Sequence, residues 1–265
     1  MDDAVPDLLF FPTGGGKTEA YLGLTAYTFA VRRLQGVISG VDPVDTVDGG
    51  RGVAVLMRYT LRLLTAQQFQ RAAALVCATE VLRRRTLNSE IASLGAEPFT
   101  LGLWVGGSVT PNRFDEAEKY VRSKKGQGNK SDAFSTSPVP VRECPWCGSK
   151  IDPARDVTAD PKTRRIVIYC GDTTGTCEFT NRRNTGFGLP IVAVDEQIYR
   201  EPPTLLIATV DKFAQLPWNG ATAHLFGRVL SCCERHGYKH PDMAKTMKCE
   251  GDSHRADGAL PTART

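Results

Sequence analysis

Apolar residues in this chain form short runs that alternate with amphipathic stretches of helical length. The runs lie at residues 8–11, 53–57, 100–105, 190–194 and 204–209, and helical stretches occupy residues 17–35, the region up to about 85, and 113–122. Short, continuously apolar runs that alternate with helices are typical of parallel strands buried on both faces. The sequence therefore predicts an α/β fold with a parallel sheet that helices cover on both sides.

The apolar residues of the predicted helices are expected to pack in the core. In the first helix the buried face is predicted to consist of Tyr21, Leu24, Tyr27, Phe29 and Leu34. Cys77 stands alone in the apolar part of the second long helix. We expect this cysteine to be a small buried residue.

The pattern changes after residue 112, and the change predicts an insertion into the sheet domain. Residues 123–137 are rich in Lys, Gly, Gln, Asn and Ser and have no apolar periodicity, which indicates a linker. The predicted parts are a first core segment (1–112), a helix and flexible linker (113–141), a cysteine-rich insertion (142–183), a second core segment (184–220) and a truncated Cys/His-rich second insertion (221–265).

A glycine-rich turn follows the first apolar run and reads Phe-Pro-Thr-Gly-Gly-Gly-Lys-Thr-Glu at residues 11–19. Glycines let successive backbone N–H groups face one phosphate group, and the next helix begins beneath them. In such a loop Lys17 reaches the outer phosphates and Thr18 holds Mg²⁺, so both are predicted to act in catalysis. The predicted site for ATP and Mg²⁺ consists of Thr13, Gly14, Gly15, Gly16, Lys17 and Thr18.

Composition and charge set only broad limits on the environment and partners of the chain. None of the apolar runs approaches the roughly twenty residues of a membrane span, and the first residues lack the features of a signal peptide. We therefore expect a cytoplasmic protein without a membrane partner. The net charge of +4 permits a nucleic-acid partner but is too small to indicate one by itself.

Four cysteines in the predicted insertion are spaced like zinc ligands. Cys144 and Cys147 lie in Cys-Pro-Trp-Cys-Gly, and Cys170 and Cys177 follow a β-rich stretch at residues 165–169. In a reducing compartment, paired cysteines bind metal more often than they form disulfides. Two such pairs satisfy a closed, tetrahedral Zn²⁺ site that holds a fold and leaves no position for a substrate. Free or redox-active thiols are the alternative.

A second zinc site is conceivable near the end of the chain. Its ligands would be Cys233, His236, Cys249 and His254. Their spacing matches no compact zinc pattern, and histidines are common on protein surfaces. The sequence therefore does not decide between a second zinc site and unrelated surface residues.

Several segments together resemble superfamily-two helicases. Residues 12–20 look like helicase motif I, and helicases tolerate a residue such as Phe11 at the first glycine position of the loop. Residues 59–67, 104–107 and 208–213 resemble motif Ia, motif Ib and a later threonine-containing contact to nucleic acid. With the four-cysteine insertion between them, the set is similar to the large helicase subunit of DISARM antiphage systems and to related zinc-containing bacterial helicases.

This resemblance implies the N-terminal RecA-like half of an ATP-dependent helicase or translocase for bacterial antiphage defence. DNA is the implied partner, with RNA as an alternative, together with subunits of the defence system. Contacts to the sugar-phosphate backbone would come from Thr60, Arg62, Gly107, Thr209 and Lys212. The Asp-Glu motif and the second RecA-like domain of the family are not recognisable. We therefore expect a fragment that does not hydrolyse ATP by itself.

One apolar run nevertheless ends like an Asp-Glu motif. Residues 191–197 read Ile-Val-Ala-Val-Asp-Glu-Gln, but they precede the Thr209 segment, which is the wrong order for the family. A solvated strand end is one interpretation of Asp195 and Glu196. If they instead hold Mg²⁺ and water, the chain is a self-contained P-loop NTPase or kinase. A third hypothesis is a non-enzymatic, zinc-containing module that binds nucleic acid.

Overall fold

The computed structural model describes residues 16–40, 46–60, 66–87, 93–127, 136–227, 229, 231–233, 237–239 and 262–263. The predicted strand at residues 8–11 lies outside this part of the chain. The central element is a four-stranded sheet in which every neighbouring pair of strands is parallel. In spatial order the strands are β3 (Val55–Tyr59), β8 (Leu205–Thr209), β4 (Leu101–Trp104) and β7 (Ile191–Val192). The prediction of an α/β fold with a parallel sheet is confirmed.

Two hydrophobic cores cover the two faces of this sheet. On one face Leu205 and Ile207 pack with residues of α1 (Lys17–Gln35) and α2 (Ala66–Thr86). On the other face Leu206 and Ala208 pack with residues of α4 (Asp195–Arg200), next to α5 (Val210–Ala214). Neighbouring residues of β8 enter opposite cores, which explains why this strand is apolar without alternation. Cys77 is fully buried in α2, as predicted.

The predicted buried face of α1 is wrong at four of its five positions. Phe29 is buried and stacks on Phe99 with ring centroids 5.1 Å apart. Arg32 and Arg33 are buried beside it and donate to the carbonyl oxygens of Arg51 (3.0 Å) and Pro98 (3.2 Å). These polar anchors orient the helix, so the other four predicted side chains face outward: Tyr21, Leu24, Tyr27 and Leu34.

Short strands from the first and last parts of the chain form two small sheets beside the central sheet. β1 (Val37–Ile38) runs antiparallel to β2 (Val47–Asp48), which is also paired in parallel with β11 (Thr262–Ala263). β9 (Ser231–Cys233) and β10 (Gly237–Lys239) form an antiparallel pair. Gly49 lies so close to α1 that an added Cβ would be 2.2 Å from the Arg32 carbonyl oxygen, so this link requires a glycine.

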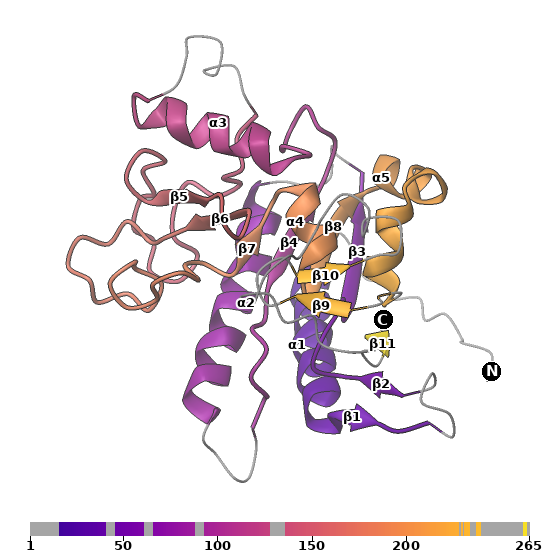
Figure 1. Cartoon of the computed structure of the whole chain (residues 1–265). Helices are drawn as coiled ribbons and strands as arrows, with labels where there is room; N and C mark the ends of the chain where they lie inside the picture. Colours follow the sequence, from indigo (N-terminus) through magenta and orange to yellow (C-terminus); the bar gives the residue numbers. More distant parts are fainter. Residues whose placement is uncertain are drawn as a thin grey trace.

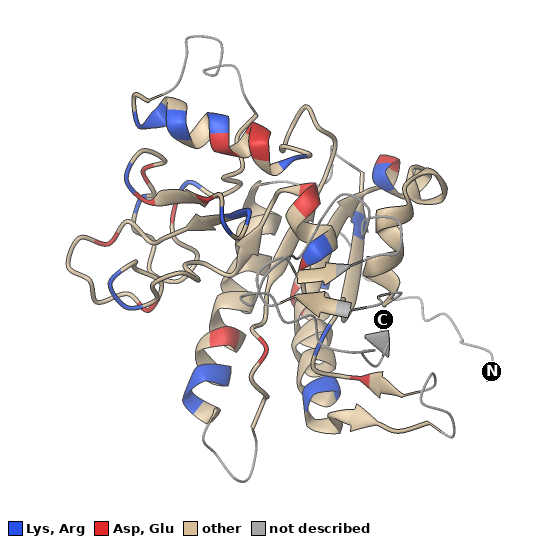
Figure 2. Ribbon diagram, in the orientation of Figure 1, with Lys and Arg blue, Asp and Glu red and all other residues tan. Residues whose placement is uncertain are grey.

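The inserted region, residues 113–183, lies beside the sheet (Figure 1). It contains α3 (Phe114–Lys124) and the antiparallel strands β5 (Val157–Asp160) and β6 (Arg165–Ile168), which Figure 1 shows on one side of the molecule. Two 3₁₀ helices, η3 (Leu216–Trp218) and η4 (Gly220–Phe226), follow α5. Along α3 the acidic residues lie toward the start of the helix and the basic residues toward its end (Figure 2), an order that suits the helix dipole. Part of the predicted linker, residues 128–135, lies outside the described residues.

The helices were also checked against the expectation that the chain has no membrane span. Within the described ranges, no helix combines the length and the apolar character that crossing a bilayer requires.

Candidate functional site

The described part of the phosphate loop opens helix α1. Gly16 is the N-cap and has φ 79° and ψ 17°, a left-handed conformation that glycine adopts without strain. Lys17 and Thr18 follow as the first residues of the helix, the end at which the helix dipole favours an anion. Thr13, Gly14 and Gly15 lie outside the described residues.

Two contacts place the start of α1 at the carboxyl end of the parallel sheet. Glu19, in the first turn of α1, forms an ion pair with Arg71 near the start of α2, the helix that follows β3. Tyr59, the last residue of β3, is close enough to Tyr21 to influence its ionisation: burial and, to a smaller extent, Tyr21 raise the pKa of Tyr59. Lys17 and Thr18 therefore lie near the carboxyl end of β3.

The same end of the sheet carries the predicted nucleic-acid contacts that the structure describes. Tyr59 pairs with Thr209 and Trp104 pairs with Ala208, so β3, β8 and β4 end side by side. Thr60 and Gly107 are exposed just beyond these ends, whereas Thr209 is buried as the N-cap of α5. Arg62 lies outside the described residues.

Lys212 does not face solvent as a backbone contact would. It is 5% exposed, and its Nζ donates to an Asp195 carboxylate oxygen and, at 3.4 Å, to Asn112 Oδ1. The same ammonium lies 5.8 Å from the centre of the Trp104 ring. Burial raises the pKa of Asp195, and the Lys212 ammonium acts against that shift. The charge of Lys212 is thus neutralised inside the protein.

Asp195 and Glu196 are not a solvated strand end. They are the first residues of α4, and Asp195 is buried. Glu196 binds Arg164 through Nε (2.6 Å) and Nη2 (3.0 Å) and accepts from the backbone N–H of Phe114 (3.0 Å). Burial acts to raise the pKa of Glu196, but these hydrogen bonds outweigh it and lower the pKa. Both carboxylates are therefore bound by other parts of the chain.

Replacing Glu196 by Gln is expected to destabilise the protein by about 1–3 kcal/mol, because the Arg164 guanidinium loses its charged partner. The folded-state pKa of Glu196 is lowered, so its stabilising effect is present above the unfolded-state pKa and is lost as the pH falls through the folded-state value. Urea unfolding at neutral and acidic pH should show a difference between variant and parent that shrinks on acidification.

Glu178→Gln is the matched control for this substitution. Glu178 lies 3.9 Å from Arg183 on the surface, where such a pair contributes about 0–1 kcal/mol. Equal destabilisation by the two substitutions would contradict the role given to the Arg164 contact.

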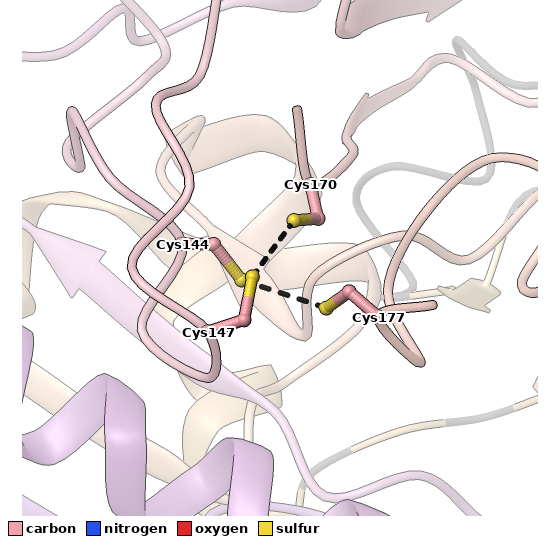
Figure 3. Close-up of side chains that lie close together, drawn as sticks. All are labelled: Cys144, Cys147, Cys170 and Cys177. Carbon is pink, nitrogen blue, oxygen red and sulfur yellow. Dashed lines mark hydrogen bonds between the residues drawn. The ribbon is translucent and has the colours of Figure 1, made fainter. Parts of the chain in front are cut away.

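The four predicted cysteine ligands converge in the inserted region (Figure 3). All four Sγ atoms lie within 4.8 Å of one another. Cys144 and Cys177 are 3.9 Å apart, and Cys147 and Cys170 are 3.3 Å apart. Gly148, at φ 77°, closes the turn after the first pair, and the Asp172 carboxylate accepts from the Cys177 N–H in the second loop. The cluster is buried except at Cys147.

These sulfur positions fit one tetrahedral metal ion. Zinc–thiolate bonds of about 2.3 Å in a tetrahedron place the sulfurs about 3.8 Å apart. Burial raises the pKa of Cys144 to about 12, whereas Cys147 has a pKa lowered to about 7, because hydrogen bonds to Ser149 and neighbouring thiols outweigh its burial. The thiols could therefore hold a metal ion, which would stabilise their thiolate form.

The cluster shares a core with the sheet domain. Cys144, Cys170 and Cys177 belong to the same hydrophobic cluster as α2 and β4. Arg84 of α2 lies over the Phe179 ring, with 5.3 Å from its Cζ to the ring centre. Of the conceivable second zinc site, Cys233 is buried on β9, and the other three residues lie outside the described residues.

The fold and this cluster define an α/β protein with a four-stranded parallel sheet and a four-cysteine cluster that could bind a metal. The chain is similar to a protein of Bacillus paralicheniformis named DISARM protein DrmA, with 42% identity over 245 residues. The match covers 89% of this chain and 20% of that protein, so the chain spans about a fifth of the length of this relative. No protein-family model matches the sequence.

Proposed function

We propose that this chain is the ATP-binding part of an ATP-dependent nucleic-acid helicase or translocase that serves bacterial antiphage defence. The observation that carries the proposal is the start of α1, where Lys17 and Thr18 follow three glycines at the carboxyl end of a parallel sheet. Ligands of open α/β sheets bind at this end. The relationship to DISARM protein DrmA supports the defence context.

In this proposal Lys17 and the N–H groups at the start of α1 bind the outer phosphates of ATP. Thr18 would hold Mg²⁺, which would neutralise charge on the β- and γ-phosphates. The glycine at position 16 lets the backbone approach the phosphates closely, because its left-handed conformation is favourable only without a side chain.

The four-cysteine cluster is proposed to hold a structural Zn²⁺ ion. Four thiolates complete a tetrahedral site and leave no coordination position for a substrate. The metal would therefore fix the loops that carry Cys144 and Cys177 rather than take part in the reaction.

DNA is proposed to lie across the carboxyl end of the sheet, near Thr60 and Gly107, and RNA is the alternative. Thr60→Glu should weaken binding of a fluorescent single-stranded oligonucleotide about fivefold, because roughly 1 kcal/mol of charge repulsion is added next to the phosphates. The difference should shrink as salt is added. Fluorescence anisotropy measures both effects.

Thr173→Glu provides the control, because Thr173 is exposed on the cysteine-rich insertion, away from the strand ends. If both variants bind the strand as the parent does, the carboxyl end of the sheet is not the nucleic-acid surface.

The isolated chain is expected not to hydrolyse ATP, with or without nucleic acid. Asp195 and Glu196 are occupied by Lys212 and Arg164. An arginine supplied by a second domain contributes about 10³–10⁵ in rate in related reactions, and among the described residues none takes that role. A steady-state phosphate-release assay measures the activity.

A measurable rate that disappears in Glu196→Gln, while that variant still binds ATP, would contradict this expectation. The chain would then be the self-contained NTPase or kinase.

A further inference from the structure

A second polar site lies at the amino end of the sheet, away from the phosphate loop. It is a cavity of about 510 Å³ whose lining includes residues just before β4, β7 and β8: Thr100, Pro190 and Thr204. The β9–β10 hairpin contributes Tyr238, and α1 and α2 contribute Arg33 and Arg84. The cavity therefore lies between the amino end of the sheet, the two long helices and the β9–β10 pair, and it is open to solvent.

The lining of this cavity carries five arginines and three glutamates. Each glutamate already has an arginine partner: Arg51 binds Glu97 at 2.9 Å, Arg84 binds Glu80 at 2.8 Å, and Arg165 binds Glu201 at 2.5 Å. Arg200 donates to the carbonyl oxygens of Thr163 and Arg164. The lining therefore has an excess of two positive charges, and within the described residues no carboxylate is hydrogen bonded to Arg33.

Arg33 is a buried cation with one side of its guanidinium unused. It is 8% exposed, its Cζ lies 4.6 Å from the Phe99 ring centre, and its Nη2 donates to Pro98. Its Nη1 is buried and has no hydrogen-bond partner among the residues that the structure describes. Burial lowers the pKa of Arg33 to about 10. Stacking and the Pro98 contact hold the group in place, and because Arg33 lines the cavity, an anion bound there would offset part of the cost of burying its charge.

We propose that this cavity binds a phosphate monoester, with Arg33 and Arg84 as its main ligands. A dianion matches the excess charge of the lining, and guanidinium groups bind phosphate oxygens with paired N–H donors. The volume exceeds that of a bare phosphate group, and the walls beside the arginines are apolar at Ile166, Leu189 and Ile191. Phe187, 64% exposed at the cavity, can cover an organic group. The ligand is therefore a phosphate carried on a small organic body or on the end of a nucleic-acid strand.

The test uses the full chain with Lys17→Ala, which removes the main phosphate contact of the proposed ATP site. Isothermal titration calorimetry is carried out with inorganic phosphate and with a nucleoside 5′-monophosphate. Both should bind, and Arg33→Met should weaken binding about tenfold or more, as expected for the loss of a hydrogen bond between charged groups. Arg122→Met, on the exposed side of α3, should change nothing.

Because Arg33→Met removes a buried side chain, Arg84→Met serves as the second variant, and circular dichroism verifies that each is folded. A 5′-phosphorylated oligonucleotide and its 5′-hydroxyl counterpart separate the two sources of phosphate. Preference for the phosphorylated strand identifies a strand end, and binding of the monophosphate alone identifies a small molecule. The proposal is overturned if Lys17→Ala binds none of these phosphates, or if folded Arg33→Met and Arg84→Met bind them unchanged. Both outcomes are measured in the Lys17→Ala background, so they do not depend on whether the proposed ATP site binds nucleotide.

Discussion

Cys144→Ser, or removal of metal with a chelator, is expected to loosen residues 142–183 while the strands of the central sheet stay paired. Cys144, Cys170 and Cys177 are buried and converge within 4.8 Å, so without a metal their loops lose the interaction that brings them together. Structural zinc contributes apparent binding free energies of about 10–16 kcal/mol in small zinc peptides. The cluster should therefore dominate the stability of its surroundings.

Hydrogen–deuterium exchange measures this effect segment by segment. Chelation should speed exchange around β5 and β6 far more than in β3 and β8. Metal analysis of reduced protein should give about one zinc per chain. The control variant Cys232→Ser changes a cysteine outside the cluster and should have the same zinc content. Substoichiometric zinc, or exchange that chelation leaves unchanged, would show that the four thiols do not hold the insertion together.

Lys17→Ala is expected to abolish most of the nucleotide affinity. In a phosphate loop the backbone N–H groups surround the phosphates, and the lysine ammonium supplies the mobile positive charge. Losing a hydrogen bond from a charged group costs about 1.5–3 kcal/mol, which corresponds to roughly 10- to 100-fold in affinity. The fold should be largely unaffected, because Lys17 is only half-buried, in the first turn of α1 and outside the two hydrophobic cores.

Strands β4, β7 and β8 were predictable because each is buried on both faces. β8 is a continuous apolar run whose neighbouring residues enter opposite cores, and burial of this kind leaves a signal in the sequence itself. The four-cysteine cluster was predictable for a different reason: metal ligands require particular residue types at short spacings.

The side-chain contacts at the strand ends were not predictable. Glu196 meets Arg164 and Asp195 meets Lys212 only after α4, α5 and the β5–β6 turn have been placed by tertiary packing. No local pattern links residues that are 32 and 17 positions apart. Lys212 was therefore predicted as a nucleic-acid contact from its motif alone, although its ammonium is bound inside the protein.

The prediction of the buried face of α1 was wrong for a related reason. Apolar periodicity assumes that buried positions are apolar, but Arg32 and Arg33 are buried because carbonyl oxygens of other segments accept their hydrogen bonds. Leu24 and Tyr27 then lie on the opposite side. Arginines of this kind also form the phosphate cavity, which had no sequence signature.

The most direct test of the proposed function is calorimetric titration of the chain with ATP, in the presence and absence of Mg²⁺. We expect weak, Mg²⁺-dependent binding to the parent chain and loss of most of that affinity in Lys17→Ala, with Lys125→Ala, on the exposed end of α3, as the control. Equal affinity of the parent and Lys17→Ala for ATP would contradict the phosphate loop and the helicase proposal that depends on it.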